Sequence, residues 1–139
     1  MKIVINSCYG GFGLSTNALR LYAKRKGKKT WVVENKYEHE QVITVPPEQL
    51  CKSSDDLDWC SMTPPEKEAH NNLWKEQHVT DSSIARDDPD LVYVVEKLKH
   101  NADGRCAELR VVEIPDAVKW YIVEYDGNEH IAEEHRTWR

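Results

Sequence analysis

The dipeptide Asp126-Gly127 constrains the fold of this 139-residue chain more than any other short segment. Asp-Gly between two runs rich in apolar residues is the strongest local signal for a two-residue β-hairpin turn. With this turn, Ile122 faces Ile131 across the two strands. The alternative is a helix over residues 129–138, and the turn chemistry favours the hairpin. The C-terminal end of the chain therefore predicts antiparallel strands.

Two other segments carry helix start signals. Ser15 is a good N-cap for a helix over residues 16–26, and Gly27 supplies its C-terminal stop. Asp88 followed by Pro89 starts a second helix that ends near residue 100. Strands are expected over residues 2–6, 30–33, 41–45, 106–114 and 119–125. The predicted fold class is α+β, with a mostly antiparallel sheet packed against two main helices and a C-terminal hairpin.

The middle of the chain is polar and differs from both ends. The whole chain has a length that suits a single domain. We therefore interpret residues 46–83 as a loop-rich insertion within that domain. Inside this insertion, Thr63 and Glu66 have the spacing of a capping box. A polar helix is expected to follow to about residue 77 and to bury Ala69, Leu73 and Trp74.

Charge is distributed unevenly along the chain. The formal net charge is -5, yet residues 1–30 hold seven Lys or Arg and no Asp or Glu. A net acidic chain is a poor sequence-blind ligand for nucleic acid, so we expect no DNA or RNA partner. The basic cluster 24–29 lies more than about 10 Å along the predicted helix from its start. Within one subunit, the cluster therefore cannot contact a small site at the start of the helix. It could do so only where two subunits of an oligomer meet.

The sequence disfavours both a membrane-spanning protein and a metal-binding protein. Apolar runs such as Leu91–Val95 are far shorter than the roughly 20 residues of a membrane span, and the first residues lack a signal-peptide stretch. We therefore expect a cytoplasmic protein without a membrane partner. Cys51, Cys60, His70 and His78 match no common zinc template, so we expect no metal and no cofactor.

A glycine-rich loop between the first strand and the first helix is the leading candidate for chemistry. Backbone N–H groups and the positive end of a helix dipole can together hold an anion. The loop matches neither the Walker A nor the dinucleotide-binding glycine pattern. The alternative is a tight turn whose aromatic side chains pack into the core. The candidate residues are Tyr9, Gly10, Gly11, Phe12 and Gly13.

The C-terminal end mixes a guanidinium, imidazoles, carboxylates and an indole ring. Arg136 with Trp138 suits a nucleotide-binding edge, because Arg binds phosphate in bidentate fashion and rings stack on bases. His135 with Glu133 suits an acid–base site instead. The alternative is a solvated last strand.

Two isolated arginines are further candidates for holding an anion. Arg86 precedes the acidic pair Asp87-Asp88 at a helix start, and Arg105 follows Gly104. An arginine in the first setting often only pairs with the acidic caps, and Arg105 is the weaker candidate.

Several segments carry a resemblance to a known family. They are residues 3–15, 86–92 with 94–96, 101–105 leading to 111–115, and 124–127 with Glu129, Ile131, Glu133, His135, Arg136, Thr137 and Trp138. These segments resemble a widespread family of small phage and prophage proteins, over roughly residues 1–27 and 84–139. That family is similar to the phage Thoeris anti-defence sponges, homo-oligomers that sequester cyclic ADP-ribose-type signals and in some cases cyclic oligonucleotides.

The resemblance implies a non-enzymatic homo-oligomer in the host cytoplasm that captures a small phosphorylated nucleotide without cleaving it. Two alternatives stay open. One is a small nucleotide-processing enzyme that uses His135 and Glu133. The other is a protein-binding inhibitor that presents its acidic surface to a host defence protein.

Overall fold

The computed structural model describes residues 1–135 and residue 138. Its elements, in chain order, are β1 (Lys2–Asn6), α1 (Thr16–Arg25), β2 (Trp31–Glu34), β3 (Glu40–Ile43), α2 (Pro64–Gln77), β4 (His78–Val79), α3 (Pro89–Leu98), β5 (Leu109–Glu113), β6 (Trp120–Tyr125) and β7 (Asn128–Glu133). Short 3-10 helices cover Pro47–Gln49, Ser54–Asp56, Trp59–Ser61, Asp81–Ser83 and Lys99–Ala102. All strand pairs among these residues are antiparallel, and the predicted α+β class is confirmed.

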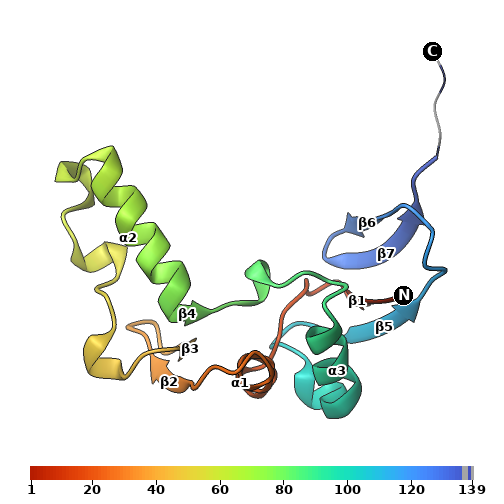
Figure 1. The fold of residues 1–139 in the computed structure, drawn as a ribbon, viewed down its shortest axis with the longest axis horizontal. Coiled ribbons are helices and arrows are strands. Elements are labelled where there is room, and N and C mark those ends of the chain that lie inside the picture. The colour runs from red at the N-terminus through yellow and green to blue at the C-terminus, as the bar shows by residue number, and fades with distance from the viewer. Residues whose placement is uncertain (136–137, 139) are drawn as a thin grey trace.

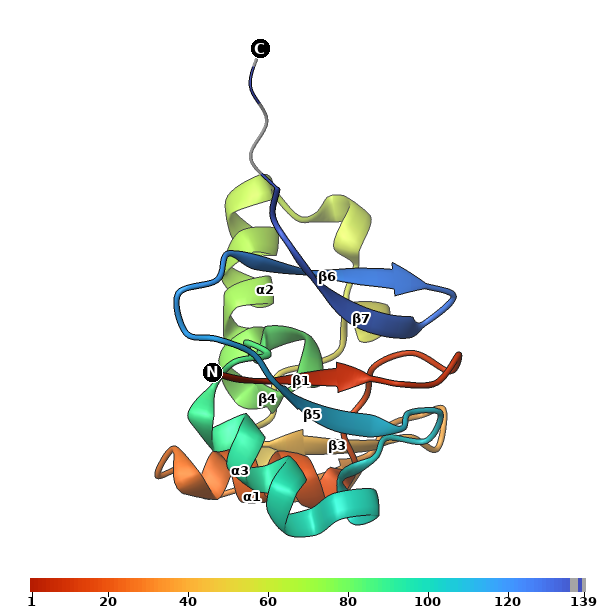
Figure 2. The same cartoon turned by 90° about the vertical axis from the view of Figure 1, so that its right-hand side faces the viewer.

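The strands divide into three small sheets. β1 pairs with β5, β3 lies between β2 and β4, and β6 pairs with β7. The β6–β7 hairpin lies along β1, on the side opposite to β5 and the helices (Figure 2). The strands therefore form a stack of short ladders rather than one continuous sheet.

The predicted C-terminal hairpin is confirmed. Ile122 faces Ile131, and Tyr125 faces Asn128 at the two-residue turn. Asp126 and Gly127 have φ angles of 50° and 86°, the positive values that this tight turn requires. Residues 129–133 are a strand, so the alternative of a helix beginning at residue 129 is wrong.

The predicted helix caps are confirmed as well. The Ser15 side chain accepts a hydrogen bond from the Ala18 N–H, and the Asp88 carboxylate caps α3, whose first residue is Pro89. Thr63 and Glu66 form the expected reciprocal capping box at the start of α2. Local polar residues thus position all three helices.

The hydrophobic core lies where α1 and α3 pack on the β1–β5 pair. Val4, Ala18, Leu91, Val94 and Ala102 have no exposed surface. Leu91 and Val94 sit three residues apart on the face of α3 that meets this cluster. The core therefore joins residues from both ends of the chain.

α2 lies apart from this core. Ala69 and Leu73 are exposed, Leu73 by 41%, so the expectation that α2 buries them is wrong. Gln77 is the one buried residue of the helix, and its side chain bonds the backbone of Gln49 and Cys51. The C-terminal end of α2 joins the helix to the body of the molecule, and its middle contacts the segment 59–61 through the His70 and Trp59 rings. The helix projects as a separate arm (Figure 1).

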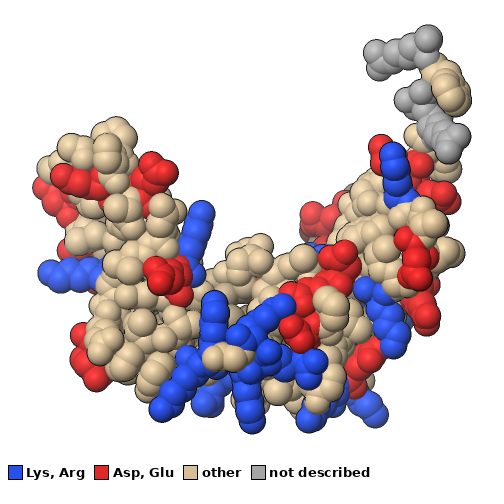
Figure 3. Space-filling view, viewed as in Figure 1, with Lys and Arg blue, Asp and Glu red and all other residues tan. Residues whose placement is uncertain are grey.

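The molecule has the shape of a crescent. α2 forms one arm, the β6–β7 hairpin forms the other, and α1 lies at the base between them (Figure 1). The surface between the arms is hollowed (Figure 3). This base brings the C-terminal ends of α1 and α2 close to each other.

Candidate functional site

The glycine loop is filled by the protein's own backbone. A Cβ atom on Gly10 would collide with the carbonyl oxygen of Cys106, and one on Gly127 would lie 2.5 Å from the Gly11 nitrogen. The Gly104 N–H also donates to the Gly13 carbonyl at 2.9 Å. Glycine at residues 10 and 127 thus permits three segments of backbone to meet.

The start of α1 already faces two carboxylates. The Leu14 N–H donates to Asp81 Oδ2 at 3.2 Å, and the Thr16 hydroxyl donates to Glu40 Oε2 at 2.7 Å. Ser15 satisfies a further N–H as the N-cap. These groups occupy the place where the sequence predicted a bound anion, and their negative charge opposes one.

Arg86 is paired inside the fold. Its guanidinium binds the Glu129 carboxylate in bidentate fashion, with N–O distances of 2.8 and 2.9 Å. The same guanidinium lies over the Phe12 ring, 3.4 Å from its centre. The partner is therefore a glutamate 43 residues away rather than the neighbouring acidic pair. Arg86 and Phe12 act together as structural groups.

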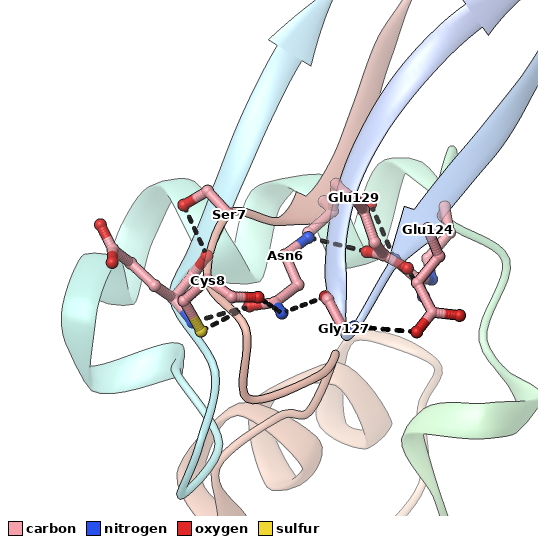
Figure 4. A network of polar contacts seen from close by, with 9 residues as sticks. Asn6, Ser7, Cys8, Glu124, Gly127 and Glu129 are labelled. Atoms are coloured by element: carbon pink, nitrogen blue, oxygen red, sulfur yellow. Dashed lines mark hydrogen bonds and ion pairs between the residues drawn. The ribbon is translucent and has the colours of Figure 1, made fainter.

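Asn6 is a buried polar residue that the sequence did not single out. Its amide donates to the carbonyls of Cys8 and Gly127, and its side-chain oxygen accepts from the Glu108 N–H (Figure 4). Its backbone N–H donates to Glu129 Oε1 at 2.8 Å (Figure 4). An asparagine at the end of a strand, just before a glycine loop, was the only signal available.

The remaining predicted residues lie in two separate places. Tyr9 is 66% exposed beside the hairpin turn, and Arg105 is exposed in the loop that contacts Gly10. His135 and Trp138 follow β7 at the end opposite to the turn, and both are exposed. Arg136 lies outside the described residues. The predicted residues therefore do not form one site.

A cavity at the base of the crescent gathers positive charge instead. It has a volume of about 460 Å³ and lies between α1, the α2–β4 junction and the segment before α3. The ammonium-bearing residues Lys26, Lys28 and Lys75 line it, together with Tyr22 and His78. Lys and Arg side chains gather over this base (Figure 3). Lys75 comes from a distant part of the sequence, so the sequence could not assign it to this group.

Two of these lysines retain unpaired charge. Lys26 binds Asp88 at 3.2 Å and Asp90 at 2.8 Å, which raises its pKa. Neither Lys28 nor Lys75 forms an ion pair with any residue that the structure describes. Their ammonium groups are available to an anion.

The cavity wall also carries a tyrosine and a histidine. Burial, followed by a hydrogen bond to Asp88, raises the pKa of Tyr22 to about 12. Burial lowers the pKa of His78, whose Nδ1 lies 2.8 Å from the Trp74 carbonyl oxygen. His78 is thus neutral at pH 7.

Two features of the described residues bear on the metal and membrane expectations. No three His, Cys, Asp or Glu side chains there come together as a metal site would need. None of the helices in this part of the chain is both long and apolar enough to span a bilayer.

No protein-family model, curated protein or solved structure matches the chain.

Proposed function

We propose that this chain is a binding protein that captures a small phosphorylated nucleotide in the cavity lined by Lys26, Lys28 and Lys75. The ligand is a cyclic ADP-ribose-type signal or a cyclic oligonucleotide, and it is held without being cleaved. This activity would make the chain a phage counter-defence protein that acts as a homo-oligomer in the host cytoplasm.

One observation supports the proposal: Lys28 and Lys75 come from distant segments, have no ion-pair partner among the described residues, and line one cavity together with the paired Lys26. A volume of about 460 Å³ lies within the range of small-molecule sites, roughly 300–1,000 Å³. Ammonium groups bind phosphate through charge-assisted hydrogen bonds, which are about twice as strong as neutral ones. The Tyr22 ring adds an aromatic surface to the cavity wall.

Titration calorimetry with cyclic ADP-ribose variants and cyclic di- and trinucleotides tests this function. At least one compound should bind, and it should be recovered intact after the protein is heated. Lys28→Ala and Lys75→Ala should each weaken binding by about tenfold, the loss expected for one charge-assisted hydrogen bond. Failure of the whole panel to bind would reject the proposal.

Lys24→Ala is the matched control. Lys24 is exposed on the last turn of α1, yet it does not line the cavity. The variant removes the same charge and should change affinity by less than about twofold. An equal loss in all three variants would indicate diffuse charge attraction rather than a site.

A second candidate function is inhibition of a host protein by contact. Tyr121 and Tyr125 on β6 are 49% and 79% exposed, and acidic residues such as Glu124 and Asp126 lie beside them. Tyrosine is enriched at protein interfaces. A stoichiometric host partner, lost in Tyr121→Ser with Tyr125→Ser, would favour this function over nucleotide capture.

A further inference from the structure

A second cavity lies on the other side of the α2–β4 junction. It has a volume of about 500 Å³, is open to solvent, and is bordered by the β2–β3 hairpin, the segment 47–56 and the C-terminal end of α2. Only His78 lines both this cavity and the lysine cavity. The second cavity is therefore a separate site with its own chemistry.

One end of this cavity is aromatic and apolar. The Trp74 and His78 rings are stacked there, with centres 4.0 Å apart and planes 12° apart. His78 pairs with Ile43 at the end of β3 that is remote from the β2–β3 turn. Pro47 and Leu50 also line the cavity. This end is therefore lined by two stacked rings and two apolar side chains.

The opposite end is acidic and lies at the β2–β3 turn. Glu34 is the last residue of β2, and Asp55 and Asp56 belong to the segment that faces the turn. Asp55 Oδ2 lies 3.1 Å from the Lys36 ammonium and accepts a hydrogen bond from the Tyr37 hydroxyl at 3.4 Å. These two contacts fix Asp55 to the turn.

The charges of this end favour a cation. Asp55 neutralises Lys36. The remaining charged residues of the lining are two carboxylates, Glu34 and Asp56, and one ammonium group, that of Lys52. The Lys36 ammonium also lies 5.2 Å from the centre of the Tyr37 ring. A carboxylate and an aromatic face thus already hold one ammonium group at the cavity wall.

We propose that this cavity binds an organic cation, namely a protonated amine carried on a flat aromatic body. The amine lies at the turn, near Glu34 and Asp56. The aromatic body lies against Trp74. The site is independent of the lysine cavity, which selects the opposite charge.

Three indole probes of similar size but different charge test the proposal. Tryptamine is a cation, tryptophol is neutral and indole-3-acetate is an anion. In titrations followed by ¹H–¹⁵N NMR, tryptamine should shift the Trp74 indole N–H and the backbone signals of Glu34 and Asp56. It should bind about two- to fivefold more tightly than tryptophol, as expected for one added exposed ion pair. Equal binding of all three probes, stronger binding of the anion, or shifts elsewhere would overturn the proposal.

Two double variants distinguish specific binding in this cavity from general attraction of a cation to an acidic protein. Glu34→Gln with Asp56→Asn removes both unpaired carboxylates and should abolish the preference for tryptamine over tryptophol. Asp58→Asn with Glu68→Gln removes two nearby exposed carboxylates that do not line the cavity, and should keep the preference. Loss of the preference in the control would refute a specific site. Both double variants keep every apolar contact, so a thermal melt can verify that they fold.

Discussion

Glu129 is one of the residues that hold the C-terminal hairpin to the rest of the molecule. Its carboxylate binds the Arg86 guanidinium with both oxygens and also accepts the Asn6 backbone N–H. The Glu129 side chain is 8% exposed, so the pair is largely shielded from water. Removing one partner of such a pair leaves a shielded charge without compensation.

Glu129→Gln should therefore lower the free energy of unfolding by about 3 kcal/mol, as measured by urea denaturation. Glu124→Gln is the control, because Glu124 lies opposite Glu129 on β6 and is exposed. The control should change the free energy by less than about 1 kcal/mol. Equal effects of the two variants would contradict the structural role of Glu129.

His78 makes the stability of the fold depend on pH in a defined direction. Burial lowers its folded-state pKa, so the unfolded chain binds the proton more readily. The stability that neutral His78 provides is fully present above the unfolded pKa of about 6.5, and it is lost as pH falls toward the folded value. Denaturation at several pH values should show His78→Gln with a flatter stability curve below pH 6.5. His130→Gln, at an exposed position on β7, should keep the wild-type curve.

At the scale of elements, the turn of the hairpin has two functions. It reverses the chain at positive φ, and it meets the glycine loop at backbone distance, because a Cβ on Gly127 would lie 2.5 Å from the Gly11 nitrogen. The turn therefore also sets where the hairpin lies along β1.

A comparison of two glycines separates these functions. Gly27 also has a positive φ, 77°, but a Cβ there would meet no atom within 4 Å. Gly27→Ala should cost about 1 kcal/mol from backbone strain alone. Gly127→Ala should cost at least about twice as much, because the backbone must also move apart. Thermal or urea unfolding measures both, and equal costs would mean that the contact with Gly11 does not constrain the hairpin.

The elements that the sequence predicted are those specified by neighbouring residues. Ser15, Thr63 and Asp88 cap helices through bonds to residues two or three positions away, and Asp126-Gly127 defines a turn of two residues. The burial of α2 could not be predicted in this way. A helix buries a face only if another element covers it, and the residues of the helix alone do not show whether such an element is present.

At the scale of the whole molecule, the uneven charge of the chain has two different uses. Arg25 and Lys26 bind Asp90 at the ends of α1 and α3, and Arg25 also lies 3.7 Å from the centre of the Tyr93 ring. This part of the basic block joins two helices. Lys28 instead lines the cavity at the base of the crescent, as does Lys75.

The position of the lysine cavity could not be predicted from the sequence, because it depends on contacts between distant segments. The glycine loop and the isolated Arg86 had the right chemistry for an anion, but long-range contacts fill the one and neutralise the other. Lys28 and Lys75 lie 47 residues apart in sequence and have no motif in common, so only the fold brings them to one cavity.

The most direct test of nucleotide capture is to locate the bound phosphate. In a ¹H–¹⁵N NMR titration with the tightest cyclic nucleotide, the largest shifts should fall on the backbone signals of Lys26, Lys28, Lys75 and Ser83, and residues 9–13 should remain unchanged. Saturation should disappear in Lys28→Ala with Lys75→Ala. Shifts centred on residues 9–13 and 104–106, with normal binding by the double variant, would contradict the lysine cavity as the site.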